Sequence, residues 1–262
     1  MRNSGPRIVI TGASSGIGEA LALAYRARYP DAAFALFARR AERLQALAGR
    51  LAPAEVRIYA IDLTDRKELG RAADDLLSAW GCPDIVIGNA GISAGTLTAE
   101  PSDARVFERI IAVNVVGLHD SFAAFLPAMR AHGGGTLVGI ASVAGIRGLP
   151  GAGAYSASKA AAIAYLESLR LEERAHGISV VTIAPGYIRT PMTDTNAYRM
   201  PFLMPVQAFA EQAIAAIAAR RSFVVIPWPM RIVALVLRAL PNIVYDRLFA
   251  RAPRKARASE NP

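Results

Sequence analysis

Short apolar runs alternate along the chain with longer segments in which apolar residues recur at helical spacing. The short runs predict strands, and the longer segments predict helices with one apolar face. Strands that alternate with helices form βαβ units, in which helices cover both faces of a parallel sheet. The pattern therefore predicts an α/β protein built on a doubly wound parallel sheet of about seven strands.

The boundaries of the expected elements follow from the same pattern. Strands are expected at residues 7–11, 33–38, 56–61, 84–88, 136–141, 178–184 and 222–226. Helices are expected near residues 16–29, 40–51, 66–80, 103–131, 153–176 and 206–220. No internal repeat or long linker interrupts the pattern, so we expect one domain at residues 1–227, with residues 228–262 as an apolar and basic extension of that domain.

Composition narrows the class of protein. Of the 262 residues, 53% are hydrophobic, which is enough for one large core. Cys82 is the only cysteine, so the chain has no internal disulfide and no cysteine-based zinc site, and we expect no metal. The first residues lack the apolar core of a signal peptide, and a cytoplasmic protein is expected.

A glycine-rich sequence, Thr11-Gly12-Ala13-Ser14-Ser15-Gly16-Ile17-Gly18, follows the first predicted strand and opens the first predicted helix. Glycine allows a tight turn and a close approach of the backbone, so that the amides at a helix N-terminus can face a pyrophosphate. A simple turn is the alternative interpretation. The position of the motif favours dinucleotide binding in a Rossmann-like fold.

The second predicted strand ends in Arg39 and Arg40, where an NAD-binding protein usually has a carboxylate for the adenosine ribose. Arginine offers a permanent charge and a planar fork that bind phosphate. NADP(H) is therefore the expected cofactor, with Arg39 as the better candidate of the pair, and a solvated helix start is the alternative. Asp62-Leu63 and Asn89-Ala90-Gly91 end the next two strands at the same edge, although both are also common in turns.

Tyr155 and Lys159 are four residues apart and share one face of a predicted helix, and Ser142 ends the strand before it. A phenol has a pKa of about 10, which a nearby ammonium and a nicotinamide cation lower by stabilising the phenolate. Such a pair alone usually marks only an amphipathic helix. After a glycine-rich loop and a serine at a strand end, it predicts a catalytic pair.

Together, these motifs resemble the short-chain dehydrogenase/reductase family over residues 7 to about 227. The resemblance implies an NADP(H)-preferring oxidoreductase that transfers a hydride between the cofactor and a carbonyl or secondary alcohol. Ser142 would bind the substrate oxygen, Tyr155 would transfer its proton, and Lys159 would lower the tyrosine pKa and hold the nicotinamide ribose. Asn114 matches the family's asparagine that holds a water in a proton relay. Gly88 departs from the family, which often has a second asparagine there.

The resemblance also implies a set of cofactor-binding residues and an assembly. The cofactor-binding residues are Gly12, Ser14, Ser15, Gly16, Ile17, Gly18, Arg39, Asp62, Leu63, Asn89, Ala90, Gly91, Tyr155, Lys159, Pro185, Gly186, Ile188 and Thr190. The family usually pairs the helices near residues 103–131 and 153–176, so a homodimer or homotetramer is expected.

Residues 189–206 carry three prolines and three methionines without clear periodicity, and we interpret them as a lid, with an ordinary surface loop as the alternative. The apolar residues in and around this lid are Met192, Met200, Phe202, Leu203 and Met204. They favour a hydrophobic lipid-, steroid- or ketoacyl-like substrate over a sugar, and a role in lipid metabolism. A catalytically silent NADP(H)-binding regulatory or membrane-associated module is the alternative function, against which the intact catalytic residues argue.

The net charge of +9 is concentrated in residues 220–257, which carry nine basic residues and one acidic residue. Aromatic residues are not interleaved with these charges, so nucleic-acid binding is not expected. The apolar stretches 230–240 and 243–249 are too short to span a bilayer. With Trp228 and the basic residues, they suggest peripheral contact with the inner face of a membrane through residues 227–257. A cover over the substrate pocket or a subunit contact, followed by a solvated tail, is the other interpretation.

Overall fold

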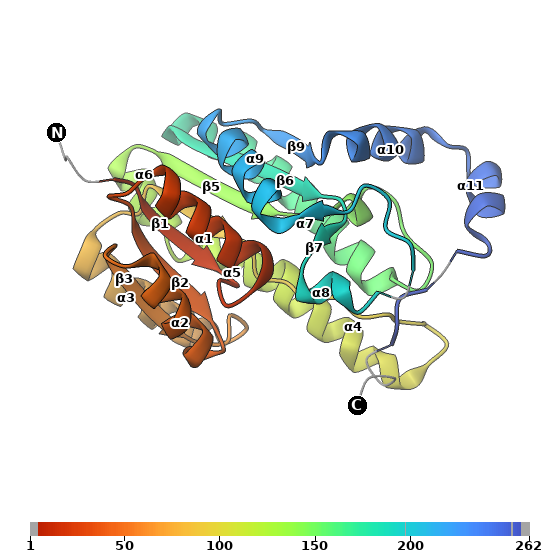
Figure 1. Cartoon of the computed structure of the whole chain (residues 1–262), viewed down its shortest axis with the longest axis horizontal. Coiled ribbons are helices and arrows are strands. Elements are labelled where there is room, and N and C mark those ends of the chain that lie inside the picture. The colour runs from red at the N-terminus through yellow and green to blue at the C-terminus, as the bar shows by residue number, and fades with distance from the viewer. Residues whose placement is uncertain (1–4, 197, 253, 258–262) are drawn as a thin grey trace.

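The computed structural model describes residues 5–196, 198–252 and 254–257 (Figure 1). Its centre is a seven-stranded parallel sheet in the order β3-β2-β1-β4-β5-β6-β9. The strands are β1 (Arg7–Thr11), β2 (Ala33–Ala38), β3 (Val56–Ala60), β4 (Ile85–Gly88), β5 (Gly135–Ile140), β6 (Ile178–Pro185) and β9 (Phe223–Ile226). The expected fold is confirmed. The strand order reverses between β1 and β4, which is where a ligand-binding crevice opens in doubly wound sheets.

Helices cover both faces of the sheet. One face carries α1 (Gly16–Arg28), α2 (Ala41–Leu51) and α9 (Val206–Ala218). The other carries α3 (Arg66–Trp80), α5 (Gly117–Ala123), α6 (Leu126–His132) and α7 (Gly153–Glu172). Successive strand residues point to opposite faces, so Ile8 and Ile10 join the first core and Val9 joins the second. The sheet is therefore buried on both sides, which explains its continuous apolar strands.

The single helix expected at residues 103–131 is divided in the structure. After α4 (Ala104–Ile111), one π-helical turn spans Ala112–Val116 and continues into α5. A break separates α5 from α6, which has Pro127 in its first turn, where a missing amide hydrogen costs least. The run Pro101–His132 is long and apolar enough to cross a membrane, but several of its apolar residues are buried in the core, as in a soluble protein's central helix.

Short structured elements replace the expected loop at residues 189–206. The two-residue strands β7 (Ile188–Arg189) and β8 (Met204–Pro205) pair in parallel, with α8 (Pro191–Asp194) between them in sequence. Short 3₁₀ turns lie elsewhere, at Pro101–Asp103, Val143–Gly145 and Arg174–His176. The segment is thus a small cap with its own hydrogen bonds.

Two C-terminal helices, α10 (Trp228–Ala239) and α11 (Asn242–Phe249), extend beyond the helical layers (Figure 1). Arg147, in the loop between β5 and α7, donates hydrogen bonds to the carbonyl oxygens of Leu237 at 2.7 Å and Leu240 at 2.6 Å. Its guanidinium also lies 4.1 Å from the ring centre of Tyr245, whose hydroxyl donates to the Gly148 carbonyl. The extension therefore braces the loop between β5 and α7.

The last described residues, 254–257, return to the body of the protein, where Gly95 and Arg257 form an isolated parallel bridge. The solvated tail of the second interpretation is therefore wrong for these residues. They pair with a loop of the main domain instead.

We expect Arg147→Met to lower the free energy of unfolding by about 2 kcal/mol, because the carbonyl groups at the end of α10 lose a charged donor. Denaturant unfolding measures this change. Limited proteolysis should also cut first within residues 228–252 of the variant. Arg105→Met, which alters an exposed arginine of α4, is the matched control and should change neither property. Wild-type stability and cleavage in Arg147→Met would contradict the bracing.

Candidate active site

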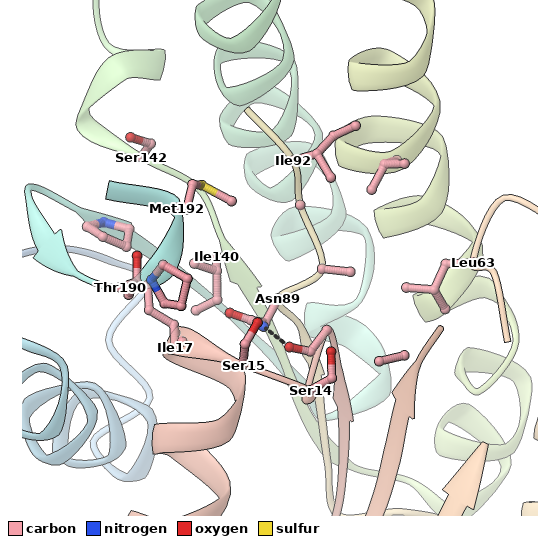
Figure 2. A pocket seen from close by; sticks show the side chains of 18 of the residues that line it. Ser14, Ser15, Ile17, Leu63, Asn89, Ile92, Ile140, Ser142, Thr190 and Met192 are labelled. Carbon is pink, nitrogen blue, oxygen red and sulfur yellow. Dashed lines mark hydrogen bonds between the residues drawn. The ribbon is translucent and has the colours of Figure 1, made fainter. Parts of the chain in front are cut away.

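A cleft of about 400 Å³ opens at the carboxyl ends of the central strands. Its lining comes from the ends of β1 to β6, from residues 188 and 190–193, and from side chains of α4 and α7. Figure 2 shows Ser14 and Ser15 toward one end, and Ser142 and Met192 toward the other. This is the place where open α/β sheets bind ligands.

Every expected cofactor-binding residue lines the cleft except Gly18. Gly18 lies beneath the glycine-rich loop, where a Cβ atom would be 2.5 Å from the Gly12 carbonyl oxygen and 2.6 Å from Nδ2 of Asn89. Its assignment as a cofactor-binding residue stays a prediction, since Gly18 does not line the cleft itself. Gly18 instead allows α1 to pack closely against the loop and β4.

The glycine-rich loop has the geometry of a pyrophosphate cradle. Gly12 has a φ of +67°, and a Cβ atom there would be 2.7 Å from Cα of Ala90. Nδ2 of Asn89 donates to the carbonyl oxygens of Thr11 at 2.9 Å and Gly12 at 3.2 Å, which ties the loop to β4. Ser15 begins α1 without a side-chain capping bond, so the first amides of the helix are open to a ligand. These residues fit a dinucleotide.

Arg40, rather than Arg39, reaches the glycine-rich loop. Its Nε and Nη2 atoms donate to Oγ of Ser14 at 3.2 and 2.8 Å, and Nη2 also donates to Oγ of Ser15 at 2.8 Å. Arg39 is 63% exposed and lies 3.9 Å from Asp62. Burial first, and then the charges of Arg43 and Arg39, lower the pKa of Arg40 from its usual value. Both arginines line the cleft, so the preference for Arg39 stays a prediction, and the contacts of Arg40 make it a second candidate for the phosphate.

Asp62 ends the adjacent strand as an ionised carboxylate. It accepts hydrogen bonds from Thr64 N at 3.0 Å, Thr64 Oγ1 at 2.7 Å and Arg109 Nη2 at 2.9 Å. Burial alone would raise the pKa of Asp62, but the Thr64 hydrogen bonds and the charges of Arg109 and Arg39 lower it. Arg109 belongs to α4 and also lines the cleft, a contribution that the sequence analysis missed.

Three of the four expected catalytic residues, Ser142, Tyr155 and Lys159, line the other end of the cleft. Oγ of Ser142 accepts a hydrogen bond from Ala144 N at 3.1 Å, and the Ser142 hydroxyl also contacts the phenol of Tyr155. Nζ of Lys159 donates to the Ile140 carbonyl at 2.8 Å and lies 5.9 Å from the ring centre of Tyr155. The end of β5 thus positions both the serine and the lysine.

Burial is the largest influence on the pKa values of Tyr155 and Lys159. It raises the pKa of Tyr155, and the contact with the Ser142 hydroxyl lowers that pKa only in part. Burial also lowers the pKa of Lys159 to about 8. The lysine was expected to lower the tyrosine pKa, whereas among the protein's own groups desolvation has the larger effect. Tyr155 is therefore a protonated phenol at neutral pH, the form that can donate a proton to a carbonyl oxygen.

Asn114 lies behind the cleft, in the π-helical turn, and is 1% exposed. Its Oδ1 accepts from Ile92 N at 2.8 Å, and its Nδ2 donates to Ile92 O at 3.0 Å and Ser158 Oγ at 2.9 Å. Ser158 donates in turn to the carbonyl oxygen of Tyr155 at 2.8 Å. Asn114 therefore links the loop after β4 to the first turn of α7, and its role in holding a water stays a prediction.

Gly88 departs from the resemblance without disturbing the site. A Cβ atom at this position would collide with Leu118 and lie 3.1 Å from Phe122, so the core of the protein fills the space of a larger residue. Asn89 still makes its hydrogen bonds to β1.

The expected substrate-contacting residues separate in the structure. Met192 lines the catalytic end of the cleft, whereas Met200, Phe202, Leu203 and Met204 do not. Met204 instead packs against the core, and Phe202 is 53% exposed. The cleft is also lined by residues that had not been assigned to the cofactor or the substrate. They are Ala38, Arg40, Ile61, Ile92, Arg109, Val113, Ile140, Ala141, Pro191 and Thr193. Arg109 and Val113 are four residues apart, so helical spacing was the one signal available for them.

Known proteins share this arrangement. The family model for short chain dehydrogenases matches residues 6–200. An uncharacterized oxidoreductase of Myxococcus xanthus is 37% identical over 243 residues, which cover 91% of this chain and 94% of that protein. Dehydrogenase/reductase SDR family member 7B of Bos taurus is 34% identical, with 97% of this chain and 83% of that protein covered.

A solved structure extends the similarity to three dimensions. L-Sorbose reductase from Gluconobacter frateurii, complexed with NADPH and L-sorbose, superposes with a TM-score of 0.76 at 26% identity, covering 84% of this chain and 95% of that chain. The family match spans the glycine-rich loop, the strand ends and the serine, tyrosine and lysine of the cleft. The chain therefore belongs to the short-chain dehydrogenase/reductase family and is an oxidoreductase that acts on an alcohol or carbonyl group.

Proposed function

We propose that this protein is an NADPH-dependent reductase/dehydrogenase that transfers a hydride between NADP(H) and a carbonyl or secondary alcohol of a hydrophobic substrate. The contact of Arg40 with Ser14 and Ser15 carries the cofactor assignment. It places a guanidinium at the glycine-rich loop, and β2 is followed by two arginines instead of the carboxylate that would repel a 2′-phosphate. The NADPH complex of the similar L-sorbose reductase supports this proposal.

The side chains of the cleft supply positioning and proton transfer. The bound nicotinamide would supply the hydride. Ser142 donates a hydrogen bond to the substrate oxygen, and Tyr155 donates its phenolic proton to that oxygen during reduction. Lys159, held by the Ile140 carbonyl, lies beside the tyrosine ring and stabilises the phenolate that forms. This arrangement argues against a catalytically silent binding module.

The apolar walls of the catalytic end favour a hydrophobic substrate. Ile92 and Met192 both line the cleft, and Figure 2 shows Met192 near Ser142, with Ile92 across the view from them. A methionine side chain adapts its shape to flexible apolar groups. We therefore retain a lipid-, steroid- or ketoacyl-like carbonyl compound as the substrate class.

Tyr155→Phe should abolish NADPH-dependent reduction of hydrophobic ketones while leaving NADPH affinity nearly unchanged, because the ring remains and the transferable proton is lost. NADPH oxidation and fluorescence titration measure the two quantities. Tyr165→Phe alters a tyrosine of the same helix outside the cleft and should keep wild-type turnover. Substantial turnover by Tyr155→Phe would mean that another group provides the proton.

Arg40→Met should reduce the preference for NADPH over NADH by about tenfold, equivalent to about 1.4 kcal/mol, since it removes one charge-assisted phosphate contact. We expect the wild type to bind NADPH at least about tenfold more tightly than NADH. Arg39→Met should have a smaller effect, and Arg71→Met, at an exposed arginine of α3 outside the cleft, serves as the control. Equal wild-type affinities for the two cofactors would refute the NADP(H) assignment.

We also propose that α10 and α11 lie on the surface of an anionic membrane. Met230 and Ala234 of α10 face the core, while its opposite side is apolar and exposed. The exposed apolar residues of the two helices are Trp228, Ile232, Leu235, Val236, Ile243, Val244 and Leu248. An apolar surface of this extent on neighbouring helices is typical of an interaction site.

The charges beside this surface favour an anionic bilayer over a protein partner. Arg231 and Arg238 are seven residues apart and flank the apolar stripe of α10. A groove of about 1030 Å³ between α10, α7 and α9 is also lined by Arg170, Arg221 and Glu167. Lipid phosphates would meet the guanidinium groups while Trp228 enters the acyl boundary. A cytoplasmic protein bound in this way to the inner face of a membrane gains access to a lipid-like substrate.

Sedimentation with phosphatidylglycerol vesicles should capture the wild-type protein, phosphatidylcholine vesicles should capture much less, and high salt should partly release it. Leu235→Asp should abolish capture by placing a carboxylate in the contact. Phe202→Asp is the control, because Phe202 is also an exposed apolar residue, at 53%, but lies outside α10 and α11. If the wild-type protein stays in the supernatant at low salt, the membrane proposal is wrong. Truncation at residue 227 is a poorer test, because it also removes the partners of Arg147.

The assembly expected from the resemblance, a homodimer or homotetramer, stays a prediction. The helices that would form it expose Phe107 and Leu171, and the π turn exposes Val116. These side chains are the ones that a paired arrangement of α4 and α7 would cover.

A further inference from the structure

The end of the described chain is docked beside the loop that follows β4. Gly95 N donates to the carbonyl oxygen of Ala256 at 2.9 Å on one side of this loop. On its other side, Thr96 N donates to the carbonyl oxygen of Gly151 at 3.0 Å. Residues 254–257, the loop at 92–97 and the loop between Ser142 and Tyr155 therefore lie next to one another.

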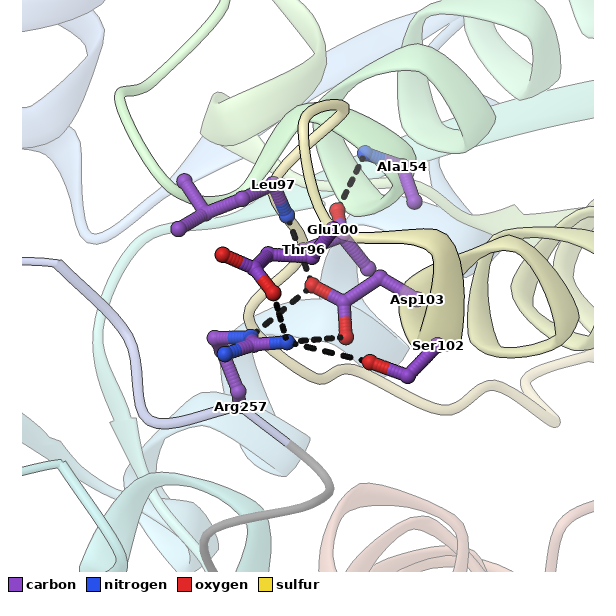
Figure 3. A network of polar contacts seen from close by, with 7 residues as sticks. All are labelled: Thr96, Leu97, Glu100, Ser102, Asp103, Ala154 and Arg257. Atoms are coloured by element: carbon purple, nitrogen blue, oxygen red, sulfur yellow. Dashed lines mark hydrogen bonds and ion pairs between the residues drawn. The ribbon is translucent and has the colours of Figure 1, made fainter.

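Arg257 anchors this arrangement (Figure 3). Its Nε donates to Asp103 Oδ2 at 3.0 Å, and its Nη2 donates to Asp103 Oδ1 and Ser102 Oγ at 3.2 Å each and to Glu100 Oε2 at 3.3 Å. Asp103 is 3% exposed and also accepts from Leu97 N at 2.9 Å. The hydrogen bonds from Arg257 and Leu97 lower the pKa of Asp103. One ionised carboxylate thus holds both the tail and the loop.

The loop after β4 and the loop before α7 each have a glycine where residues 254–257 pack against them. A Cβ atom at Gly95 would collide with the carbonyl oxygen of Lys255. Gly151 has a φ of +73°, and a Cβ atom there would be 2.8 Å from Cβ of Arg254. A larger residue at either position would displace the tail, so the loops are shaped for residues 254–257.

Lys255 differs from Arg257 in its partners. Its Nζ donates to Ser93 Oγ at 3.0 Å, and it has no acidic partner among the described residues. The side chain is half-buried, and burial lowers its pKa. An ammonium has three donors, and withdrawing it from water without a counter-charge costs free energy that a bound anion would recover.

Ser93 connects this ammonium with the cleft. Ile92, the preceding residue, lines the catalytic end and is fixed by Asn114. A Cβ atom at Gly91 would be 3.5 Å from Nζ of Lys159. Ser93 and Lys255 are not part of the cleft lining, and Lys255 therefore lies just beyond its catalytic end, bonded to the residue that follows Ile92.

We propose that Lys255, with Ser93, forms an anion-binding subsite of the substrate cleft, so that the preferred substrate joins a hydrophobic carbonyl compound to a carboxylate or phosphate group. The proposal rests on the proposed function and narrows its substrate class to amphipathic anions. Arg257 is a positioning residue for this subsite, since it holds Lys255 beside the loop through Asp103.

The test compares a medium-chain keto fatty acid with its methyl ester, which share the carbonyl and the chain but differ in charge. The wild type should reduce the acid with a kcat/KM at least about tenfold higher than the ester. Lys255→Met should remove this preference by raising KM for the acid, with kcat and the ester reaction unchanged. Lys255→Arg should retain most of the preference, because the positive charge remains. Lys67→Met, at an exposed lysine of α3, should behave as the wild type.

A second pair of substrates tests whether the subsite binds a phosphate group. Acyl thioesters of coenzyme A and of N-acetylcysteamine share the 3-oxoacyl group, and only the first carries phosphates. A carboxylate preference without a coenzyme A preference assigns the subsite to carboxylates, and the reverse assigns it to phosphates. In either case Lys255→Met should abolish the preference that the wild type shows.

Three different results would contradict the anion subsite, the role of Lys255 in it, or the proposed function. Equal wild-type kcat/KM values within both substrate pairs would overturn the subsite and leave the proposed function intact. An equal loss with charged and uncharged substrates in Lys255→Met, together with a lower melting temperature, would make Lys255 a structural residue of the tail. No NADPH oxidation with any of these carbonyl compounds would refute the proposed function itself.

Discussion

The hydrogen bond between the Lys159 ammonium and the Ile140 carbonyl is the interaction on which the active site depends. Burial lowers the pKa of Lys159 to about 8, so the fold disfavours the charged form by about 3 kcal/mol relative to water. A methionine would pack there at no such cost. The carbonyl at the end of β5 offsets part of the penalty, because it gives the ammonium a partner where the protein interior has few.

The parallel sheet makes this arrangement possible. Every strand delivers its carboxyl end to the same edge, so Ser142 from β5 and the glycine-rich loop after β1 meet in one cleft although they are far apart in sequence. Helix α7 then brings Tyr155 and Lys159 to that edge on one face. In the polypeptide alone, burial raises the pKa of Tyr155 and keeps the phenol protonated. The lowered pKa expected from the sequence would therefore require a further positive charge, such as that of the nicotinamide.

The positions of the strands along the chain and most of the cleft were predictable, because apolar periodicity and strand-end motifs are local signals. The choice between Arg39 and Arg40 was not, because it depends on the backbone direction between β2 and α2, where neighbouring side chains diverge. Arg109 reaches Asp62 from α4, and no local pattern marks that pairing. The π turn at Asn114 was hidden for the same reason, since its partners Ile92 and Ser158 come from two other segments.

The C-terminal extension also makes contacts with distant segments of the chain that no local sequence pattern marks. Its arginines were interpreted as surface charges, but Arg257 bonds to Asp103, which is 154 residues away in the chain. Arg147 and Tyr245 join α10 and α11 to one substrate-side loop, and residues 254–257 join the other. The glycine-rich loop and the strand ends of the cleft lie within the family match, whereas α10, α11 and residues 254–257 lie outside it. Because the extension contacts the loops on both sides of Ser142 and Tyr155, its sequence determines how these loops are held, whereas the strand ends that form the rest of the cleft do not depend on it.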